Sequence, residues 1–332
     1  MSSPPGTDPD SIVLRFPVAR EFAGQRLDVF IQSRIPRLSR TRAQAIVKAC
    51  AYRSDGTRRR ASERVRPGEV VLLVRQRFVE PETPQEFGVL YEDPHVLAVD
   101  KPAGLPMHPT ATYHRNTLTW LLRQRYGDSP PHIAHRLDRE TSGVVLCGKH
   151  REAERGLKMA FEGRRVSKIY LAIVRGEPSD DEGTIDIPMD RAREGLHLLM
   201  EARAEGDGLP ARSHYRVRER CGGHTLLELS LETGRQHQLR VHLAAIGHAI
   251  VGDKLYGPDG SEPFLEQIET GMTEALRRWV GHDRQALHAH RVTVEHPHTG
   301  EQLVVESPLA ADLQTLWSSY GEAAEQGGAG AP

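Results

Sequence analysis

Apolar residues recur at helical spacing early in the chain and are followed by an extended apolar run. Residues 26–35 and 36–50 have the helical period, and Ser39 is a candidate N-cap for the second segment. One apolar stripe of that segment consists of Ala43, Ile46, Val47 and Cys50. Two turn signals, Ser-Asp-Gly and Pro-Gly, precede the apolar run 70–74. This pattern predicts two helices followed by a hairpin.

Strand patterns dominate from residue 88 onward. Two β-rich runs in 88–101 flank the sequence Glu-Asp-Pro-His, which predicts a hairpin with proline in its turn. Further strands are predicted at 143–148, 167–175, 213–218, 225–231, 287–295 and 302–306. Helices are predicted at 118–125, 151–162, 236–246 and 264–280. Because strands and helices do not alternate regularly, we expect an α+β domain with a large mixed, mainly antiparallel sheet.

The length of 332 residues suits two domains better than one. Residues 78–87 are acidic and proline-rich, as an inter-domain linker would be. We therefore expect a small α/β domain at 14–77 and a larger domain at 88–320. Residues 1–13 and 321–332 are rich in small and polar residues and are predicted to be disordered tails.

Charge is unevenly distributed along the chain. The formal net charge is −1, yet residues 14–77 contain 16 Lys and Arg against five Asp and Glu, an excess of 11 positive charges. A basic segment on a near-neutral body is typical of an RNA-binding appendage, and a solvated basic face without a ligand is the alternative.

Composition excludes several classes of protein. With 38% hydrophobic and 27% charged residues, the chain is typical of a globular protein that folds in water. It has neither a run of about 20 apolar residues nor an apolar N-terminal signal, so we expect a cytoplasmic protein. The three cysteines form no CxxC pair, which favours buried thiols over disulfides or a cysteine-ligated zinc.

The N-terminal sequence GQRLDVFIQSRIPRLSRTRAQAIVKAC, followed by a basic turn and RVRPGEVV, resembles the αL RNA-binding motif, a small domain first known from a ribosomal small-subunit protein. The match covers about fifty residues. The resemblance implies that the second helix and the loop after it face RNA. The implied contact residues are Arg40, Arg42, Lys48, Arg58, Arg59 and Arg60.

A polar loop joins an apolar strand in the segment 133–149, IAHRLDRETSGVVLCGK. Loops beside rigid sheets often hold catalytic groups. Taken alone, Arg136 and Asp138 also fit a surface ion-pair loop. The small residues of Thr-Ser-Gly suit a tight turn with its backbone close to a ligand.

The segment HRLDRETSG resembles the central motif of the RluA-type RNA pseudouridine synthases, and four further motifs follow that family's order. These are VLYEDPHVLAVDKPAGLPMHP, SKIYLAIVRG, LETGRQHQLRVHLAAIGHAIVGDKLYG and ALHAHRVTVEHPHTGE, within 88–306. The resemblance implies the pseudouridine synthase fold, with Asp138 as the essential aspartate and Tyr170 as the active-site tyrosine. It also implies that Arg240 pairs with the aspartate and that Arg136 occupies the place of the extruded uridine.

The chemistry of such a reaction agrees with these roles. Breaking the bond from ribose to uracil nitrogen and remaking it to carbon five oxidises nothing, so we expect no nucleotide, metal or redox cofactor. A carboxylate is needed either as a nucleophile or as a base that removes a ribose proton, and both routes stay open. Arg240 would keep Asp138 ionised despite burial. Tyr170 offers a flat face for the base, with a plain core tyrosine as the alternative.

The 17 histidines raise the possibility of a metal site. His237 and His242 are five residues apart, which does not place two ligands on one helical face. His288 and His290 alternate on one side of a strand but lack a third ligand, so we expect no metal. Arg235 and His135 either contact phosphate or order their loops.

These observations predict a monomeric RNA pseudouridine synthase that acts on structured RNA, most simply large-subunit ribosomal RNA. Three alternatives remain. They are a synthase for transfer RNA, a non-catalytic RNA-binding assembly factor, and a histidine-metal hydrolase.

Overall fold

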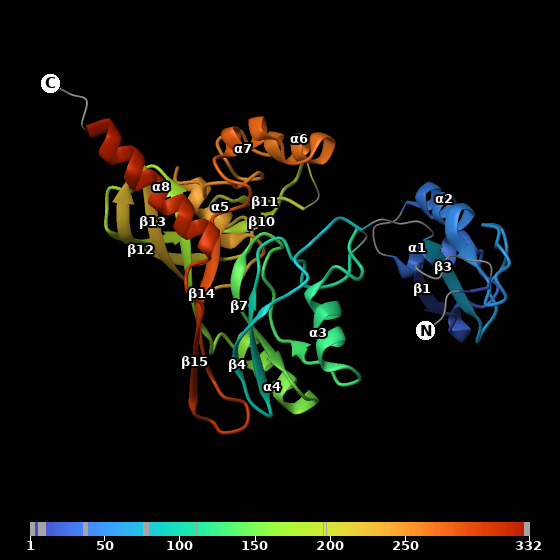
Figure 1. Ribbon diagram of the computed structural model, residues 1–332. Helices are drawn as coiled ribbons and strands as arrows, with labels where there is room; N and C mark the ends of the chain where they lie inside the picture. The colour runs from blue at the N-terminus through green and yellow to red at the C-terminus, as the bar shows by residue number, and fades with distance from the viewer. Residues whose placement is uncertain are drawn as a thin grey trace. The chain divides into compact units, whose positions relative to one another are not determined.

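The computed structural model divides the chain into two compact units, Met1–Pro81 and Glu82–Pro332 (Figure 1). The structure describes residues 4–5, 11–35, 39–75, 80–110, 112–194, 196 and 198–328. The boundary falls in the segment predicted as a linker, of which residues 78 and 79 lie outside the described residues. Most of the predicted N-terminal tail also lies outside them, but its last two residues begin strand β1 (Ile12–Pro17).

The N-terminal unit contains the two predicted helices and the predicted hairpin. Helix α1 (Leu27–Arg34) and helix α2 (Arg40–Cys50) pack with an antiparallel sheet of order β1–β3–β2. Strands β2 (Ala51–Tyr52) and β3 (Val70–Arg75) form the hairpin. Helix α2 begins as predicted, because the Ser39 hydroxyl accepts a hydrogen bond of 3.2 Å from the backbone N–H of Arg42. A short 3-10 helix, η1 (Arg20–Phe22), precedes α1.

A mixed sheet forms the centre of the larger unit. Its main path, within the described residues, runs β4–β5–β7–β14–β8–β13–β12–β9, with β15 beside β14 and β6 beside β7. The strands are β4 (Gly88–Glu92), β5 (Val96–Lys101), β6 (His132–Ile133), β7 (Ser142–Gly148), β8 (Ser167–Arg175), β9 (Glu182–Asp186), β12 (Arg212–Cys221), β13 (His224–Leu231), β14 (Leu287–Glu295) and β15 (Gln302–Glu306). Only β7 and β14 pair in parallel among these strands as described. The predicted α+β class with a mainly antiparallel sheet is confirmed.

Helices and one further hairpin surround this sheet. The helices are α3 (Leu118–Tyr126), α4 (Arg151–Glu162), α5 (Gln238–Ala245), α6 (Glu262–Thr270), α7 (Glu274–Val280) and α8 (Ala311–Gly328). The hairpin consists of β10 (Met189–Arg191) and β11 (Met200–Ala202). No helix in the described part of the chain is both long and apolar enough to cross a bilayer.

Two predicted boundaries are wrong. The helix predicted at 264–280 is two helices, because Gly271 has φ of +75° and ends α6, while the Thr273 hydroxyl caps the start of α7. The tail predicted at 321–332 is helical through residue 328. Leu313 is fully buried near the start of α8 and anchors the helix, so the Glu and Ala residues that follow extend it without a new nucleation cost.

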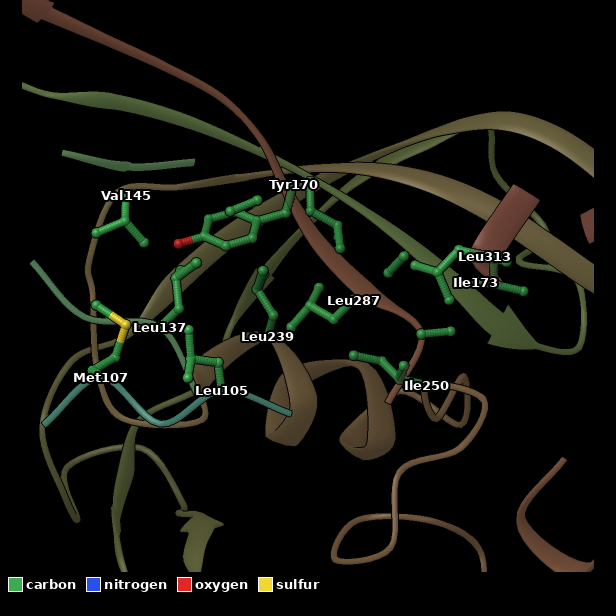
Figure 2. Close-up of a cluster of buried hydrophobic side chains, with 14 of the residues drawn as sticks. Leu105, Met107, Leu137, Val145, Tyr170, Ile173, Leu239, Ile250, Leu287 and Leu313 are labelled. Carbon is green, nitrogen blue, oxygen red and sulfur yellow. The ribbon is translucent and has the colours of Figure 1, made fainter. Parts of the chain in front are cut away.

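Buried side chains form a core on each face of the sheet. One core includes Leu97, Val99 and Tyr170 and is covered by α3, α5 and α8; Figure 2 shows part of it. The other core includes Val96 and Ala98 and is covered by α4. Neighbouring residues of one strand contribute to opposite cores because side chains alternate along a strand. Strand β7 is buried along its whole length, which anchors the loop that precedes it.

Gly143 lies where β7 and β14 cross in parallel. Its φ is +109°, and a Cβ atom there would lie 2.2 Å from the carbonyl oxygen of Ala289. The sequence predicted that this turn brings backbone close to a ligand. The close approach is instead between the two strands, which requires glycine for steric reasons.

We expect Gly143→Ala to destabilise the larger unit by roughly 3 kcal/mol or more, since it adds a backbone clash to an unfavourable φ. Gly127→Ala is the matched control, because its φ is +68° but nothing lies within 4 Å of the added Cβ. That control should cost only its backbone strain, about 1–3 kcal/mol. Thermal unfolding of both variants tests the difference, and equal losses would contradict the steric explanation.

Candidate active site

The loop that carries Asp138 lies between β6 and β7 and is fixed by a buried lysine. The Lys101 ammonium is fully buried and donates hydrogen bonds to three carbonyl oxygens, those of Pro102 (2.8 Å), Leu105 (3.0 Å) and Arg139 (3.1 Å). Burial lowers the pKa of Lys101 to about 7. Because Arg139 immediately follows Asp138 in the chain, this network fixes the backbone beside Asp138.

Glu140 and Thr141 fix the other side of the same loop. Lys254 donates to the Glu140 carboxylate at 2.9 Å, and Arg284 donates to the Glu140 carbonyl at 3.2 Å. Gln285 donates to the Thr141 hydroxyl at 2.7 Å. The loop is therefore held through both backbone and side chains on either side of Asp138, as precise positioning of a reactive group requires.

Arg240, on α5, lies between two carboxylates. Its Nη1 donates to Oδ2 of Asp138 at 3.0 Å, while Nε and Nη2 donate to Asp253 at 2.6 and 2.9 Å. The predicted pairing of Arg240 with Asp138 is present in the structure. Arg240 makes its two parallel hydrogen bonds with Asp253, whose side chain is 1% exposed. It makes a single hydrogen bond with Asp138.

Asp253 and Tyr256 were not predicted as site residues. Asp253 also accepts from the backbone N–H groups of Leu255 (2.9 Å) and Tyr256 (3.1 Å), and the Tyr256 ring lies 4.9 Å from the Arg240 guanidinium carbon. The ring therefore adds a cation–π contact. Both residues occur in the motif segment GDKLYG, but their contact with Arg240 arises only from the tertiary fold.

His237 lies beside Asp138 in an orientation that its neighbours define. Tyr256 accepts from the backbone N–H of Met200 at 3.0 Å, so its hydroxyl proton is free to point to Nδ1 of His237, 2.7 Å away. This arrangement leaves the Nε2–H of His237 facing Oδ1 of Asp138 at 3.8 Å. His237 has φ of +58°, in the left-handed region that non-glycine residues rarely adopt, and such strain is typical of functional sites.

The charges of this cluster follow from its contacts. Burial opposes ionisation of Asp138, but Arg240, together with His237 and the amide of Gln285, outweighs it and holds the pKa of Asp138 below its usual range. Burial, together with Arg240, lowers the pKa of His237 to about 4. At neutral pH the site therefore contains an ionised aspartate beside a neutral histidine.

A cavity of about 260 Å³ opens above Asp138. Tyr170 lines it from β8 and is 9% exposed, and Figure 2 shows its ring among core residues such as Leu137 and Leu239. Burial raises the pKa of Tyr170 well above its usual value. The two interpretations of Tyr170 are thus compatible, because the ring belongs to the core and also forms a wall of the cavity.

The remaining residues of the HRLD segment point in different directions. Arg136 is exposed and lines the cavity. His135 points inward, where its Nε2 accepts from the backbone N–H of Leu146 at 3.0 Å and its ring stacks on Phe161 at 4.3 Å. Burial lowers the pKa of His135 to about 3, so it is a neutral structural residue and not a phosphate ligand.

The other three histidines that raised the possibility of a metal site contact protein groups. His242 contacts the Ser213 hydroxyl and the Ile187 carbonyl, both at 3.0 Å. His288 and His290 both approach the carbonyl oxygen of Ser307, at 3.2 and 2.7 Å. Among the described residues, no group of three or more His, Cys, Asp or Glu is arranged to hold a metal ion.

The predicted RNA-contact residues of the N-terminal unit differ in exposure. The exposed side chains are Arg40, Arg42, Lys48, Arg58 and Arg60. Arg59 is only 4% exposed, and its guanidinium donates to Glu63 at 3.2 Å and to Glu69 at 3.0 Å. Its position therefore fits an internal ion-pair role, and we leave it out of the candidate RNA face.

Comparison with known proteins identifies the class to which this fold and site belong. The family model described as RNA pseudouridylate synthase matches residues 95–245. Two solved structures, human RNA pseudouridylate synthase domain containing 4 and domain containing 1, align with TM-scores of 0.55 and 0.54 at 27% and 26% identity. They cover 70% and 73% of this chain, and 92% and 97% of their own.

Curated bacterial relatives match nearly the whole chain. An uncharacterized RNA pseudouridine synthase of Chloroflexus aurantiacus is 38% identical over 88% of this chain and 89% of its own length. The ribosomal large subunit pseudouridine synthase D of Xanthomonas campestris is 38% identical over 94% of both chains, and that of Nitrosomonas europaea is 35% identical over 95% and 90%. The chain belongs to the RluA-type family of RNA pseudouridine synthases, as its motifs predicted.

Substitutions of Arg240 should separate its charge from its geometry. In Arg240→Lys the charge stays, so the acid limb of the pH–rate profile should stay near the wild-type pH while the single-turnover rate falls at least about tenfold. In Arg240→Met, Asp138 loses its counter-charge, so the pKa of Asp138 rises. Asp138 is then protonated up to a higher pH, and the acid limb of the pH–rate profile shifts to higher pH.

Arg240→Met also leaves the buried Asp253 without a counter-charge, so it is tested together with Asp253→Asn. Circular dichroism checks that the double variant is folded. An acid limb that stays at the wild-type pH in the folded double variant would show that Arg240 does not keep Asp138 ionised.

Proposed function

We propose that this enzyme isomerises uridines of large-subunit ribosomal RNA to pseudouridine, with Asp138 as its catalytic carboxylate. The observation that carries the proposal is the ionised Asp138 at a cavity whose wall is Tyr170, with Arg240 as its ion-pair partner. The choice of RNA is supported by full-length relatives that are named as ribosomal large subunit enzymes.

The chemistry needs only groups that this cavity contains. A uridine extruded from its stack would place its ring against Tyr170 and its ribose near Asp138. The carboxylate then either attacks the ribose carbon or takes a ribose proton, and the bond to ring nitrogen breaks. After the base turns, a bond forms from the ribose to carbon five. In the first route the bond between Asp138 and the ribose breaks as this bond forms, and in the second route Asp138 returns the proton to the ribose. Carbon five then loses a proton and the nitrogen gains one. The product is therefore an isomer of the substrate.

Arg136 and the exposed basic side chains of the N-terminal unit would hold the RNA. Arg136 lines the cavity and is proposed to take the place of the extruded base. Action as a monomer is part of this proposal. A ribosomal RNA substrate, together with three cysteines that form no disulfide, supports a cytoplasmic location.

Replacement of the catalytic carboxylate by an amide tests this assignment. Asp138→Asn keeps the size of the side chain but removes its charge, so pseudouridine formation should fall at least about a thousandfold while RNA affinity changes little. Mass spectrometry of pseudouridine in an unmodified large-subunit RNA transcript provides the measurement. Residual activity above about a tenth of wild type would refute the role of Asp138.

Removing positive charge from α2 and the loop after it tests whether these two segments contact RNA. The triple variant Arg40→Gln, Arg42→Gln and Arg60→Gln should bind RNA more weakly, with a shallower slope of log affinity against log salt, because fewer counterions are released. The control variant Arg15→Gln, Arg20→Gln and Arg66→Gln removes the same charge from the same unit. Equal slopes for the two triple variants would show that α2 makes no specific contribution.

A further inference from the structure

Among the residues that the structure describes, three cationic side chains of the cavity have no carboxylate partner. They are Arg136, Lys168 and Arg235. Within the described residues, the guanidinium of Arg235 donates only to the carbonyl oxygen of Pro210, at 3.3 Å. In the described part of the chain, no ion pair or hydrogen bond joins the Lys168 ammonium to a protein oxygen. Arg240, in contrast, contacts two carboxylates in the same cavity.

Lys168 differs from the other lysines around the catalytic loop. Lys101 donates to three carbonyl oxygens, and Lys254 pairs with Glu140. Lys168 is half-buried, and burial lowers its pKa with no carboxylate to oppose this effect. A desolvated ammonium without a counter-charge is unfavourable in the free protein. Its presence in a ligand cavity indicates that an anion binds beside it.

The position of Lys168 indicates which anion this is. Lys168 and Tyr170 are two residues apart on β8, so their side chains point to the same face, about 7 Å apart along the strand. A Cβ atom at Gly234 would lie 3.3 Å from Nζ of Lys168, so the ammonium lies directly against the backbone preceding Arg235. A nucleotide whose ring contacts Tyr170 carries its phosphate within reach of this pair.

We propose that Lys168 and Arg235 form a phosphate subsite that binds the backbone phosphate of the extruded uridine. The inference rests on the proposed use of the Asp138 cavity by uridine, but not on which RNA contains it. The basic N-terminal unit would bind RNA of any conformation, whereas this subsite is occupied only once the target nucleotide enters the cavity. It therefore contributes to the extruded complex and not to the initial encounter.

Lys168→Met removes the ammonium and keeps most of the side-chain volume. We expect kcat/KM to fall at least about tenfold, and the slope of log kcat/KM against log salt to become shallower by about one phosphate contact. Lys168→Arg should recover most of both. The thermal midpoint of Lys168→Met should equal or exceed that of wild type, because an uncompensated charge is removed.

Lys149→Met is the matched control, since Lys149 pairs with Glu92 at the end of β7 distant from Asp138. It should leave both kinetic quantities unchanged. The substrate is total RNA from cells that lack the gene, which contains the target whether it is ribosomal or transfer RNA. Failure of the wild type on a large-subunit transcript alone would reject the ribosomal proposal and leave this test intact.

Two results would overturn the subsite. One is a Lys168→Met enzyme with wild-type kcat/KM and salt slope. The other is a lowered thermal midpoint with a loss of activity that Lys168→Arg does not restore, which would assign Lys168 a structural role.

Discussion

The buried ion pair between Arg240 and Asp253 is the interaction on which the active site depends. Asp253 takes two of the guanidinium hydrogen bonds, and the Tyr256 ring packs against the same group. With its orientation fixed in this way, Arg240 turns its Nη1 toward Asp138 and donates to it. Buried pairs of this kind contribute little net stability because desolvation offsets the attraction. The Arg240–Asp253 pair instead fixes the position of the Arg240 guanidinium. Held in this position, the guanidinium favours the ionised form of Asp138.

The sheet supplies the other constraint. The parallel contact between β7 and β14 brings the end of the Asp138 loop against β14, which pairs on its other side with the strand that carries Tyr170. Lys101, Lys254 and Arg284, from three separate segments of the chain, then fix the loop that carries Asp138. Asp138, Tyr170 and Arg240 thus come from segments far apart in sequence but line one cavity, and each is attached to a rigid part of the core.

Motifs led to the prediction of Asp138, Tyr170 and Arg240 because these residues have recognisable neighbours along the chain, and the structure brings the three together at one cavity. Periodicity was sufficient for most strands and helices of the large unit, since one buried face imposes a regular pattern. Asp253, Tyr256 and Lys101 could not be assigned in this way, because their roles depend on contacts formed only in the folded chain. The same reason applies to Arg59, whose neighbours in sequence suggested an exposed basic run although two glutamates bind it internally.

The central claim is that Asp138 is ionised in its cavity because Arg240 is held beside it. Carboxyl carbon chemical shifts, followed by NMR as a function of pH and assigned by comparison with Asp138→Asn, measure this ionisation directly. We predict that Asp138 titrates below the ordinary aspartate value of about 3.9. An Asp138 pKa above about 5 in the wild-type protein would contradict the account, because burial would then outweigh the guanidinium.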